Sequence, residues 1–495
     1  MEIFPSFSEF KRLAATYNLV PVWTEALADL ETPVGVFMKA TQGTETNFLL
    51  ESVEQGGKLG RYSFIGIQPD EIFKSSGKDV EFHNENGDIH KKTVDDPLKE
   101  LEKIVNRYRQ PKIPQLPVFA GGAVGYVSYD YVRFIENLPQ LLPDELFFPD
   151  LYFQMCFDLI VFDHLKRKIQ VVSNTKINKG CCLRDVYEKA CKKIESIISL
   201  IKKPLPYRNI GSQNKEEEFI SNCTKEEFEH SVSTAKKYIK AGDIIQVVLS
   251  QRWERELDVN PLSIYRSLRS INPSPYMFYL CFPGIHLIGS SPEILVRCNG
   301  QEALLRPIAG TRPRGKDDAE DEKLAEELKK DVKEIAEHIM LVDLGRNDLG
   351  RVCRYGTVKV TDLMFVEKYS HVMHLVTNIV GKLARGKNQF DLLRACFPAG
   401  TVSGAPKVRA MEIIEELEKS KRGPYAGAVG YFSFQGDMDF CITIRTMFSS
   451  HGKIYIQAGA GIVADSVPER EYFETINKAK ALKIAYENAR NVDYL

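Results

Sequence analysis

The sequence has no long apolar run and almost no net charge. No uninterrupted hydrophobic segment approaches the roughly 18 residues that a membrane-spanning helix needs, and the start MEIFPSFSEF has no basic segment before an apolar one. The net charge is −1 at pH 7, and charge runs such as 315–323 mix both signs. A chain of this kind offers no basic patch to nucleic acid or to a membrane surface. We therefore expect a cytoplasmic protein without nucleic-acid or membrane partners.

Cysteine is present but is not arranged as a framework. The chain has 10 cysteines, and no two of them show CxxC spacing. The adjacent pair Cys181 and Cys182 fits neither a zinc ribbon nor a secreted disulfide pattern. The cysteines are therefore expected to be reduced packing residues.

Length and pattern indicate an α+β protein with more than one domain. A chain of 495 residues with 43% hydrophobic residues can bury a large core. Residues 1–205 alternate short β-like runs with helical patterns, and the polar stretch 203–218 interrupts this alternation. We predict a domain boundary there, with an N-terminal α+β domain over 1–205 and a second domain over 220–490. A capping box of Thr224 and Glu227 is predicted to open the first helix of that domain.

One short internal repeat is visible. The segment AGGAVGYVSYD at 120–130 resembles AGAVGYFSF at 426–434, and both are typical of a β-strand that begins with glycine. Gly-Ala-Val-Gly is a common strand sequence, but the match extends through Tyr and Ser. It favours a pseudo-duplicated fold in which two sheets pack against each other.

The stretch from Gln457 to Lys478 carries groups suited to a small anion. Gly459-Ala460-Gly461 follows an apolar run, and a glycine turn there would let main-chain N–H groups approach an oxyanion. Ser466 and Glu469 are predicted to form a capping box for a helix with Pro468 in its first turn. The helix would then begin directly behind the glycines.

On that predicted helix, Glu471, Glu474 and Lys478 fall on one face. Exposed helices with such spacing are commonly solvated faces with weak ion pairs. The pattern therefore needs a partner before it indicates a site.

A second acidic pair, Glu334 and Glu337, lies in the helical pattern 317–342. Four carboxylates from two helices would repel one another unless a cation lay between them, and Mg²⁺ takes oxygen ligands of this kind. Acidic pairs on amphipathic helices are nevertheless common. The spacing alone thus gives a hypothesis of a magnesium site.

Polar motifs containing Gly or Pro crowd the chain from residue 289 onward. They are GSSPE (289–293), RPIAGTRPRG (306–315), VDLGRNDLGR (342–351), YSHVMH (369–374), FPAGTVSGAPK (397–407), GPYAG (423–427) and ITIRT (442–446). Such motifs are typical of strand-end loops that line a pocket. Together with LLES at 49–52 and NPSPYMF at 272–278, their order resembles the chorismate-utilising enzymes, and among them the anthranilate synthase large subunits. This resemblance implies two packed mixed or antiparallel β-sheets flanked by helices.

The resemblance also implies how chorismate, a small dianion, would be held. In the family, Mg²⁺ binds the ring carboxylate through glutamates that match Glu337 and Glu474, and the positions that bind its waters match Glu334 and Glu471. The enolpyruvyl carboxylate would meet a phenol and a guanidinium fork, which suits a planar carboxylate. The matching substrate-binding positions are Tyr425, Arg445, Thr401, Lys478, Gly310, Thr311, and the backbone of Gly459, Ala460 and Gly461.

Two residues match the catalytic groups of the family. Glu293 matches the general acid, which protonates the departing C4 hydroxyl as the nucleophile attacks C2. Such an acid needs a raised pKa, and an enclosed site near other carboxylates supplies one. His371 matches the histidine that removes the C2 proton as pyruvate leaves. His374, by contrast, is expected to be a core group.

Two further positions indicate which nucleophile is used. Water-using relatives carry a lysine base where Gln246 stands, and glutamine can hold a substrate but cannot act as that base. Aminodeoxychorismate synthases often carry a nucleophilic lysine where Ala309 stands. We therefore expect anthranilate and pyruvate from chorismate and ammonia through aminodeoxyisochorismate, with aminodeoxychorismate synthesis as the alternative. A catalytically silent binding subunit is disfavoured, because the matching chemical groups are all present.

The resemblance extends to partners and to regulation. The sequence has no glutaminase-like Cys/His pattern, so ammonia is expected from a separate glutaminase subunit in a hetero-oligomer. LLES and NPSPYMF resemble a feedback site for tryptophan, in which Pro275, Tyr276 and Met277 would form the indole slot and Glu51 and Ser52 would bind the amino group. The alternative is that both motifs are structural strand ends.

Overall fold

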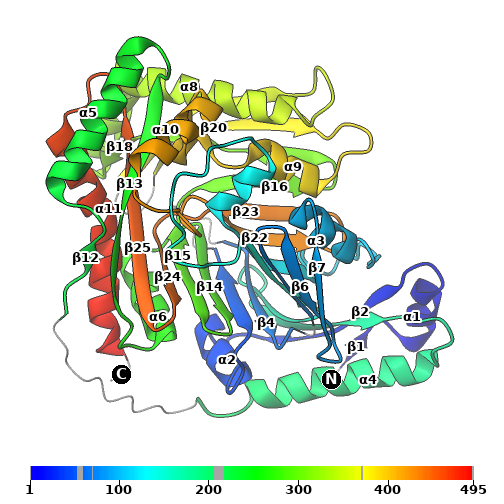
Figure 1. Ribbon diagram of the computed structural model, residues 1–495. Coiled ribbons are helices and arrows are strands. Elements are labelled where there is room, and N and C mark those ends of the chain that lie inside the picture. Colours follow the sequence, from blue (N-terminus) through cyan, green and yellow to red (C-terminus); the bar gives the residue numbers. More distant parts are fainter. Residues whose placement is uncertain (1, 53–59, 70, 206–216, 369–371, 493–495) are drawn as a thin grey trace.

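Two antiparallel β-sheets packed face to face form the centre of the protein, and helices flank them (Figure 1). The computed structural model describes residues 2–52, 60–69, 71–205, 217–368 and 372–492. Aromatic side chains fill the space between the sheets. Phe282 of one sheet, for example, stacks on Tyr152 of the other with ring centroids 4.0 Å apart. The predicted α+β fold with two packed sheets is confirmed.

The first sheet, sheet A, contains 13 strands among the described residues. Its order is β1 (Ile3–Phe4), β2 (Leu19–Leu27), β11 (Lys168–Lys176), β10 (Asp158–Asp163), β4 (Tyr62–Ile67), β3 (Asn47–Glu51), β14 (Tyr276–Phe282), β15 (Ile285–Ser291), β24 (Thr446–Ser450), β25 (Lys453–Ile462), β13 (Gln246–Glu256) and β12 (Ile220–Ser221), with β21 (Gly404–Ala405) paired to β13. Both faces of this sheet are covered. On β14, Phe278 and Leu280 enter the core between the sheets, whereas Met277 and Tyr279 pack under the helices.

The second sheet, sheet B, contains 12 strands within the same described ranges. Its order is β18 (Ile308–Pro313), β20 (Val372–Lys382), β17 (Glu302–Leu305), β16 (Ile294–Asn299), β23 (Met438–Ile442), β22 (Ala428–Ser433), β8 (Gly122–Val127), β9 (Leu151–Cys156), β5 (Glu71–Ser76), β6 (Asp79–His83) and β7 (Ile89–Thr93), with β19 (Lys359–Lys368) paired to β20.

The helices fall into groups that cover different surfaces. The outer face of sheet A is covered by α1 (Phe7–Ala14), α2 (Pro33–Ala40), α4 (Leu183–Ile201), α6 (Pro261–Ile271) and α11 (Pro468–Ala489). The end of β13 is flanked by α5 (Lys225–Ala241) and α10 (Lys407–Leu417), and β18 and β20 by α7 (Asp318–Lys330) and α8 (Val332–Gly350). The remaining helical segments are α3 (Pro97–Val105), η1 (Tyr129–Phe134), α9 (Gln389–Cys396) and η2 (Gly400–Val402). No helix among the described residues is long and apolar enough to cross a membrane.

The internal repeat marks a real duplication of architecture. Its two copies are β8 and β22, which lie side by side in sheet B with Gly125 opposite Gly430. In sheet A, the order β2-β11-β10-β4-β3 is mirrored by β13-β25-β24-β15-β14, and the two halves meet where β3 pairs with β14. Both sheets draw strands from either side of the predicted boundary, and the division into domains stays a prediction.

Two local predictions for helices are wrong. The helical pattern 317–342 is interrupted at Asp331, which ends α7 and caps α8 by accepting hydrogen bonds from the N–H groups of Lys333 and Glu334. Helix α11 begins at Pro468 as expected, but Val467 is its N-cap. The Ser466 hydroxyl does not cap the helix, because it accepts the N–H of Val463 at 3.0 Å.

Candidate active site

Two candidate residues lie where the chain crosses from one sheet to the other. Glu293 lies between β15 of sheet A and β16 of sheet B, and Arg445 lies between β23 of sheet B and β24 of sheet A. The two crossings are bonded together: Ile442 N–H donates to the Glu293 carbonyl at 3.0 Å, and Ser290 N–H to the Arg445 carbonyl at 3.1 Å. Both side chains therefore belong to one end of the sandwich.

The environment of Glu293 favours a protonated carboxyl. Burial raises its pKa to about 8, while the nearby Thr401 hydroxyl and Lys478 ammonium oppose the rise. The Thr401 hydroxyl is buried, and among the described residues it makes no hydrogen bond of standard geometry, either to Glu293 or to another group. A carboxyl in this state can donate a proton near neutral pH.

Arg445 is held in an unusual backbone conformation. Its φ is +51°, a left-handed value that non-glycine residues seldom adopt and that is often found at functional sites. Its guanidinium donates to the Lys478 carbonyl at 2.8 Å, and no carboxylate in the described ranges lies at ion-pair distance from it. Burial lowers its pKa, whereas nearby Tyr425 and Glu474 oppose this shift. The arginine is thus available for an anionic ligand.

The glycines of the predicted anion cradle lie in a strand and do not form a turn. Strand β25 continues to Ile462, and Gly459 and Gly461 lie opposite Ser250 and Val248 of β13. Ser250 N–H donates to Glu418 instead, so this pair is not hydrogen-bonded and the polar groups of Gly459 face away from β13. The backbone N–H and C=O groups of Gly461, two residues further along β25, face the same side, away from β13.

Side-chain space explains why both positions are glycine. A Cβ on Gly459 would lie 2.8 Å from the Tyr425 hydroxyl oxygen, and one on Gly461 would lie 2.6 Å from the Gln246 amide nitrogen. Lys478 closes this group, because its ammonium donates to the Gly459 carbonyl at 3.0 Å. Ala460 differs, since its methyl group is buried in the apolar cluster between β25, α5 and α10. Only the backbone of Ala460 is left for a ligand.

Gln246 connects the strand edge to the acidic helix α8. It is 6% exposed, and its side-chain oxygen has no hydrogen-bond partner in the part of the chain that is described. Burial and the neighbouring Glu334 raise the pKa of Glu337, and the adjacent Gln246 side chain opposes this. A buried amide oxygen without a partner is costly, and a ligand that donates a hydrogen bond to it would remove this cost.

The four predicted metal glutamates form two pairs on α8 and α11. Burial raises the pKa of Glu471, the neighbouring Glu474 adds to the rise, and Ser466 opposes it. Lys333 opposes the rise in pKa of both Glu471 and Glu337. The two acidic pairs therefore share one electrostatic environment. Glu334 raises the pKa of Glu337 and Glu474 raises that of Glu471, and a cation would relieve such repulsion.

These carboxylates are not gathered into a closed coordination shell. Glu334 accepts from Arg312 at 3.1 Å, and Glu474 pairs with Lys478 at 2.7 Å. Within the described ranges, no three His, Cys, Asp or Glu side chains are grouped to hold a metal ion. The donor chemistry fits Mg²⁺, while the observed contacts are ion pairs with basic side chains. Sequence reasoning missed Arg312, although it lies only two residues beyond Gly310 in the same motif.

Gly310 and Thr311 belong to a β-bulge in β18. The register shifts between Ala309 and Thr311, and Gly310 has φ +66°, with a hypothetical Cβ 3.2 Å from a Glu334 carboxylate oxygen. His374 contacts both residues through Nδ1, at 2.8 Å from the Gly310 carbonyl and 3.1 Å from the Thr311 hydroxyl. His374 thus fastens β18 to β20, while the predicted base His371 lies outside the described residues.

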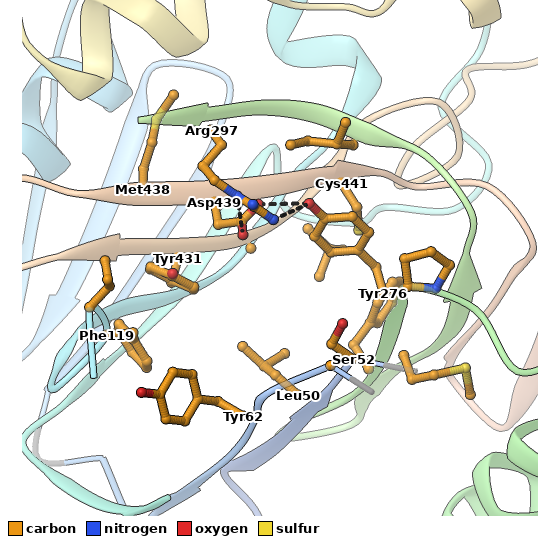
Figure 2. Close-up of a pocket in the computed structure, with 18 of the residues that line it drawn as sticks. Leu50, Ser52, Tyr62, Phe119, Tyr276, Arg297, Tyr431, Met438, Asp439 and Cys441 are labelled. Atoms are coloured by element: carbon orange, nitrogen blue, oxygen red, sulfur yellow. Dashed lines mark hydrogen bonds and ion pairs between the residues drawn. The ribbon is translucent and has the colours of Figure 1, made fainter. Parts of the chain in front are cut away.

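A second cavity, of about 570 Å³, lies between the sheets (Figure 2). LLES and NPSPYMF meet at its wall, because Glu51 of β3 pairs with Met277 of β14. Leu50, Ser52 and Tyr276 surround the open space in Figure 2, and Tyr276 donates to Asp439 at 2.9 Å. Pro275 also lines the cavity. The two motifs therefore border one cavity, whose wall includes the polar groups of Tyr276 and Asp439.

Two of the predicted inhibitor contacts, Met277 and Glu51, already have partners within the protein. The Met277 side chain is 1% exposed and packs in the cluster under the helices, because neighbouring strand residues face opposite sides. Met277 is nevertheless one of the residues that line the cavity, and its contact with an inhibitor stays a prediction. The Glu51 carboxylate is already bound by the Tyr265 hydroxyl at 2.6 Å and by Arg269 at 2.9 and 3.1 Å. Its role toward an amino group stays a prediction.

Known proteins resemble this chain over nearly its whole length. Residues 45–483 match the family described as chorismate binding enzyme. The anthranilate synthase component 1 of Acetivibrio thermocellus is 49% identical, with 99% of each chain covered, and that of Aquifex aeolicus is 48% identical over 99% of each. The crystal structure of anthranilate synthase component I from Streptococcus pneumoniae has 37% identity and a TM-score of 0.76, covering 92% of this chain and 98% of that one. The menaquinone-specific isochorismate synthase of Escherichia coli, at 20% identity and a TM-score of 0.71 over 97% and 99%, shares the fold.

Proposed function

The chain belongs to the chorismate-binding enzymes, and from this premise we propose that it converts chorismate and ammonia into anthranilate and pyruvate with Mg²⁺. The observation that carries the proposal is Glu293, a carboxyl with a pKa raised to about 8 beside the Lys478 ammonium. Gln246, which lies beside Glu337, has no basic group, and this suits a nucleophile that needs no base. The site thus supplies an acid and no water-activating lysine at that position.

Binding in this proposal uses the open strand edge and the two acidic helices. Arg445 and Tyr425 hold one carboxylate of the substrate, and the N–H groups of Gly459 and Gly461 approach it from the strand. Mg²⁺, when bound, supplies positive charge to the ring carboxylate. Its protein ligands would be Glu337 and Glu474, with Glu334 and Glu471 binding its waters.

The chemistry then proceeds in two steps. Ammonia attacks C2, the C4 hydroxyl leaves as water with the proton of Glu293, and aminodeoxyisochorismate forms. A base next removes the C2 proton, the C3–O bond breaks and the ring becomes aromatic; we assign this role to His371, and the departing enolpyruvate takes a proton from solvent to become pyruvate. The proton on Glu293 returns from solvent before the next cycle.

Two further parts of the proposal concern partners. Ammonia at neutral pH is mostly ammonium, so we assign its supply to a separate glutaminase subunit, in keeping with the "component 1" in the names of the relatives. The cavity between the sheets is assigned to tryptophan as a feedback inhibitor, because LLES and NPSPYMF both border it. We also propose a cytoplasmic location, as the proposed biosynthetic reaction suggests.

A direct assay tests the reaction. Purified chain with chorismate, Mg²⁺ and an ammonium salt at mildly alkaline pH should form fluorescent anthranilate and pyruvate in equal amounts, and EDTA should abolish both. Glutamine should replace ammonium only after a glutaminase subunit is added. Formation of 4-amino-4-deoxychorismate without pyruvate would instead show the alternative function.

A further inference from the structure

A buried arginine outside the proposed substrate contacts ties three segments of the site together. Arg422 is 1% exposed and is among the largest fully buried side chains of the protein. It belongs to the turn before GPYAG, and its guanidinium is surrounded by carbonyls, a carboxylate and two aromatic rings. A charge in such a place requires nearly complete hydrogen bonding, so its bonds show what it organises.

The Arg422 guanidinium donates to two main-chain carbonyls, and each carbonyl lies within two residues of a different site residue. One terminal nitrogen donates to the Val402 carbonyl at 2.7 Å, directly after Thr401. The other donates to the Val248 carbonyl at 2.7 Å, two residues beyond Gln246 on β13. The guanidinium carbon also lies 5.6 Å from the ring centre of Tyr425.

The charge of Arg422 is balanced by one carboxylate that has its own structural role. Glu418 accepts from Nε at 2.9 Å and from a terminal nitrogen at 2.6 Å, which is a bidentate fork. The same carboxylate accepts the N–H and the hydroxyl of Ser250, at 2.9 and 2.8 Å. Ser250 lies opposite Gly459, so the fork also fixes the strand edge that faces the substrate.

Gly423, the residue after Arg422, is held by hydrogen bonds to the N-terminal half of the chain. Gly423 N–H donates to Asp130 at 2.9 Å, and the Gly423 carbonyl accepts from the Ser128 hydroxyl and the Tyr129 N–H, both at 2.8 Å. The turn that carries Tyr425 is thus held on one side by η1 and on the other by Arg422. Loss of the arginine would leave this turn held from one side only.

We infer that Arg422 is a positioning residue for the reaction, which sets Gln246, Thr401 and Tyr425 relative to one another through its bonds to Val248, Val402 and the Tyr425 ring. The inference rests on the proposed function. It assigns no contact between Arg422 and the substrate. Lysine should not replace it, because an ammonium cannot make a planar fork to Glu418 and also reach two carbonyls in different directions.

Three variants and a matched control test the inference. Arg422→Met and Arg422→Lys are compared with Glu418→Gln and with Arg255→Met, which removes a buried arginine that pairs with Glu487 at 2.8 Å far from the site. Anthranilate formation and chorismate KM are measured at a temperature below all unfolding transitions, and thermal unfolding is measured separately. A displacement of about 1 Å in a catalytic group can cost about 100-fold in rate, and we expect a loss of this size in kcat for both Arg422 variants.

The outcomes separate positioning from simple stability. Support requires that Arg422→Lys and Arg422→Met lose kcat while folded, that Glu418→Gln loses part of it, and that Arg255→Met loses stability but keeps kcat. If Arg422→Met does not fold, the lysine and Glu418 variants decide the question alone. Full activity in Arg422→Lys, or losses that follow stability equally in all variants, would overturn the inference. A wild-type chain that makes no anthranilate would instead refute the proposed function.

Discussion

The chemistry of Glu293 depends on its place at the crossing between the sheets. The crossing surrounds its carboxyl with protein, and the resulting desolvation outweighs the favourable effects of Thr401 and Lys478 on its charge. The sequence motif GSSPE predicts the residue but not this balance. Glu293 shares a small cavity with Leu341 of α8 and Thr401 of η2, which are distant in sequence and meet it only in the fold.

The first prediction at the residue scale concerns catalysis. Glu293→Gln keeps the shape of the side chain but cannot give a proton, so kcat should fall by about 100-fold or more, as is typical for the loss of a general acid. In the wild type, the rate should decline as pH rises through about 8, because the carboxyl ionises. The rate should be measured at a constant concentration of free NH₃. An unchanged pH profile in Glu293→Gln would contradict this role.

The same residue gives a prediction about stability. The pKa of Glu293 is about 8 in the folded state, against an ordinary value of 4.5, so the folded state holds a proton that the unfolded state has released. The contribution of this group to stability is therefore complete below pH 4.5 and is lost as pH rises through about 8. Glu293→Gln should gain stability relative to wild type between pH 5 and pH 9 in urea unfolding. A constant difference across this range would show that the folded pKa is ordinary.

At the scale of elements, the bulge in β18 is a place where one added methyl group would meet a proposed metal ligand. Gly310→Ala places a Cβ at φ +66° and 3.2 Å from Glu334, so it should cost about 1 kcal/mol for the backbone and also displace a proposed metal-site carboxylate. Gly386→Ala is the control, because Gly386 has φ +80° with nothing within 4 Å of its Cβ. Urea unfolding should show a loss of stability in both variants. Only Gly310→Ala should raise the Mg²⁺ concentration needed for half-maximal activity.

Elements whose signals are local could be predicted from the sequence, and elements set by distant contacts could not. The capping box of Thr224 and Glu227 is confirmed, because both bonds lie within four residues. The cap at Ser466 is wrong because the Val463 N–H takes its hydroxyl. The glycine turn at Gly459 is wrong because its neighbours pair with β13, about two hundred residues earlier in the chain, and such pairing leaves no local signal.

At the scale of the whole molecule, the duplicated architecture contains only one proposed active site. In the duplicated arrangement, β5 corresponds to β16 and β11 corresponds to β25. Glu71 lies at the start of β5, as Glu293 lies just before β16. Lys176 lies at the end of β11, as glycines lie at the end of β25. The Lys176 ammonium lies 2.8 Å from Glu71, 2.6 Å from Glu85 and 4.1 Å from the Phe157 ring centre. The N-terminal half therefore fills the corresponding place with its own cation. The repeat at 120–130 predicts the duplication, whereas this difference between the halves depends on contacts that the sequence does not reveal.

The two cavities share the crossing between β15 and β16, which predicts how tryptophan would act. Pro292 and Ile294 line the cavity between the sheets, while Glu293 between them lines the small cavity beside Thr401. A ligand that shifts the first two residues must move the third. Tryptophan should therefore weaken chorismate binding, and by linkage chorismate should weaken tryptophan binding by the same factor.

Calorimetry with tryptophan, with and without a chorismate analogue and Mg²⁺, measures this coupling. For allosteric sites it is typically about 5-fold to 150-fold in affinity. Ser52→Phe should abolish inhibition, because the ring would occupy the cavity that Ser52 borders in Figure 2, while the catalytic end stays intact. Ser196→Phe, on the exposed face of α4, is the control and should keep it. Tryptophan affinity that is the same with and without the analogue would make the cavity a structural feature, and inhibition that survives Ser52→Phe would place the inhibitor elsewhere.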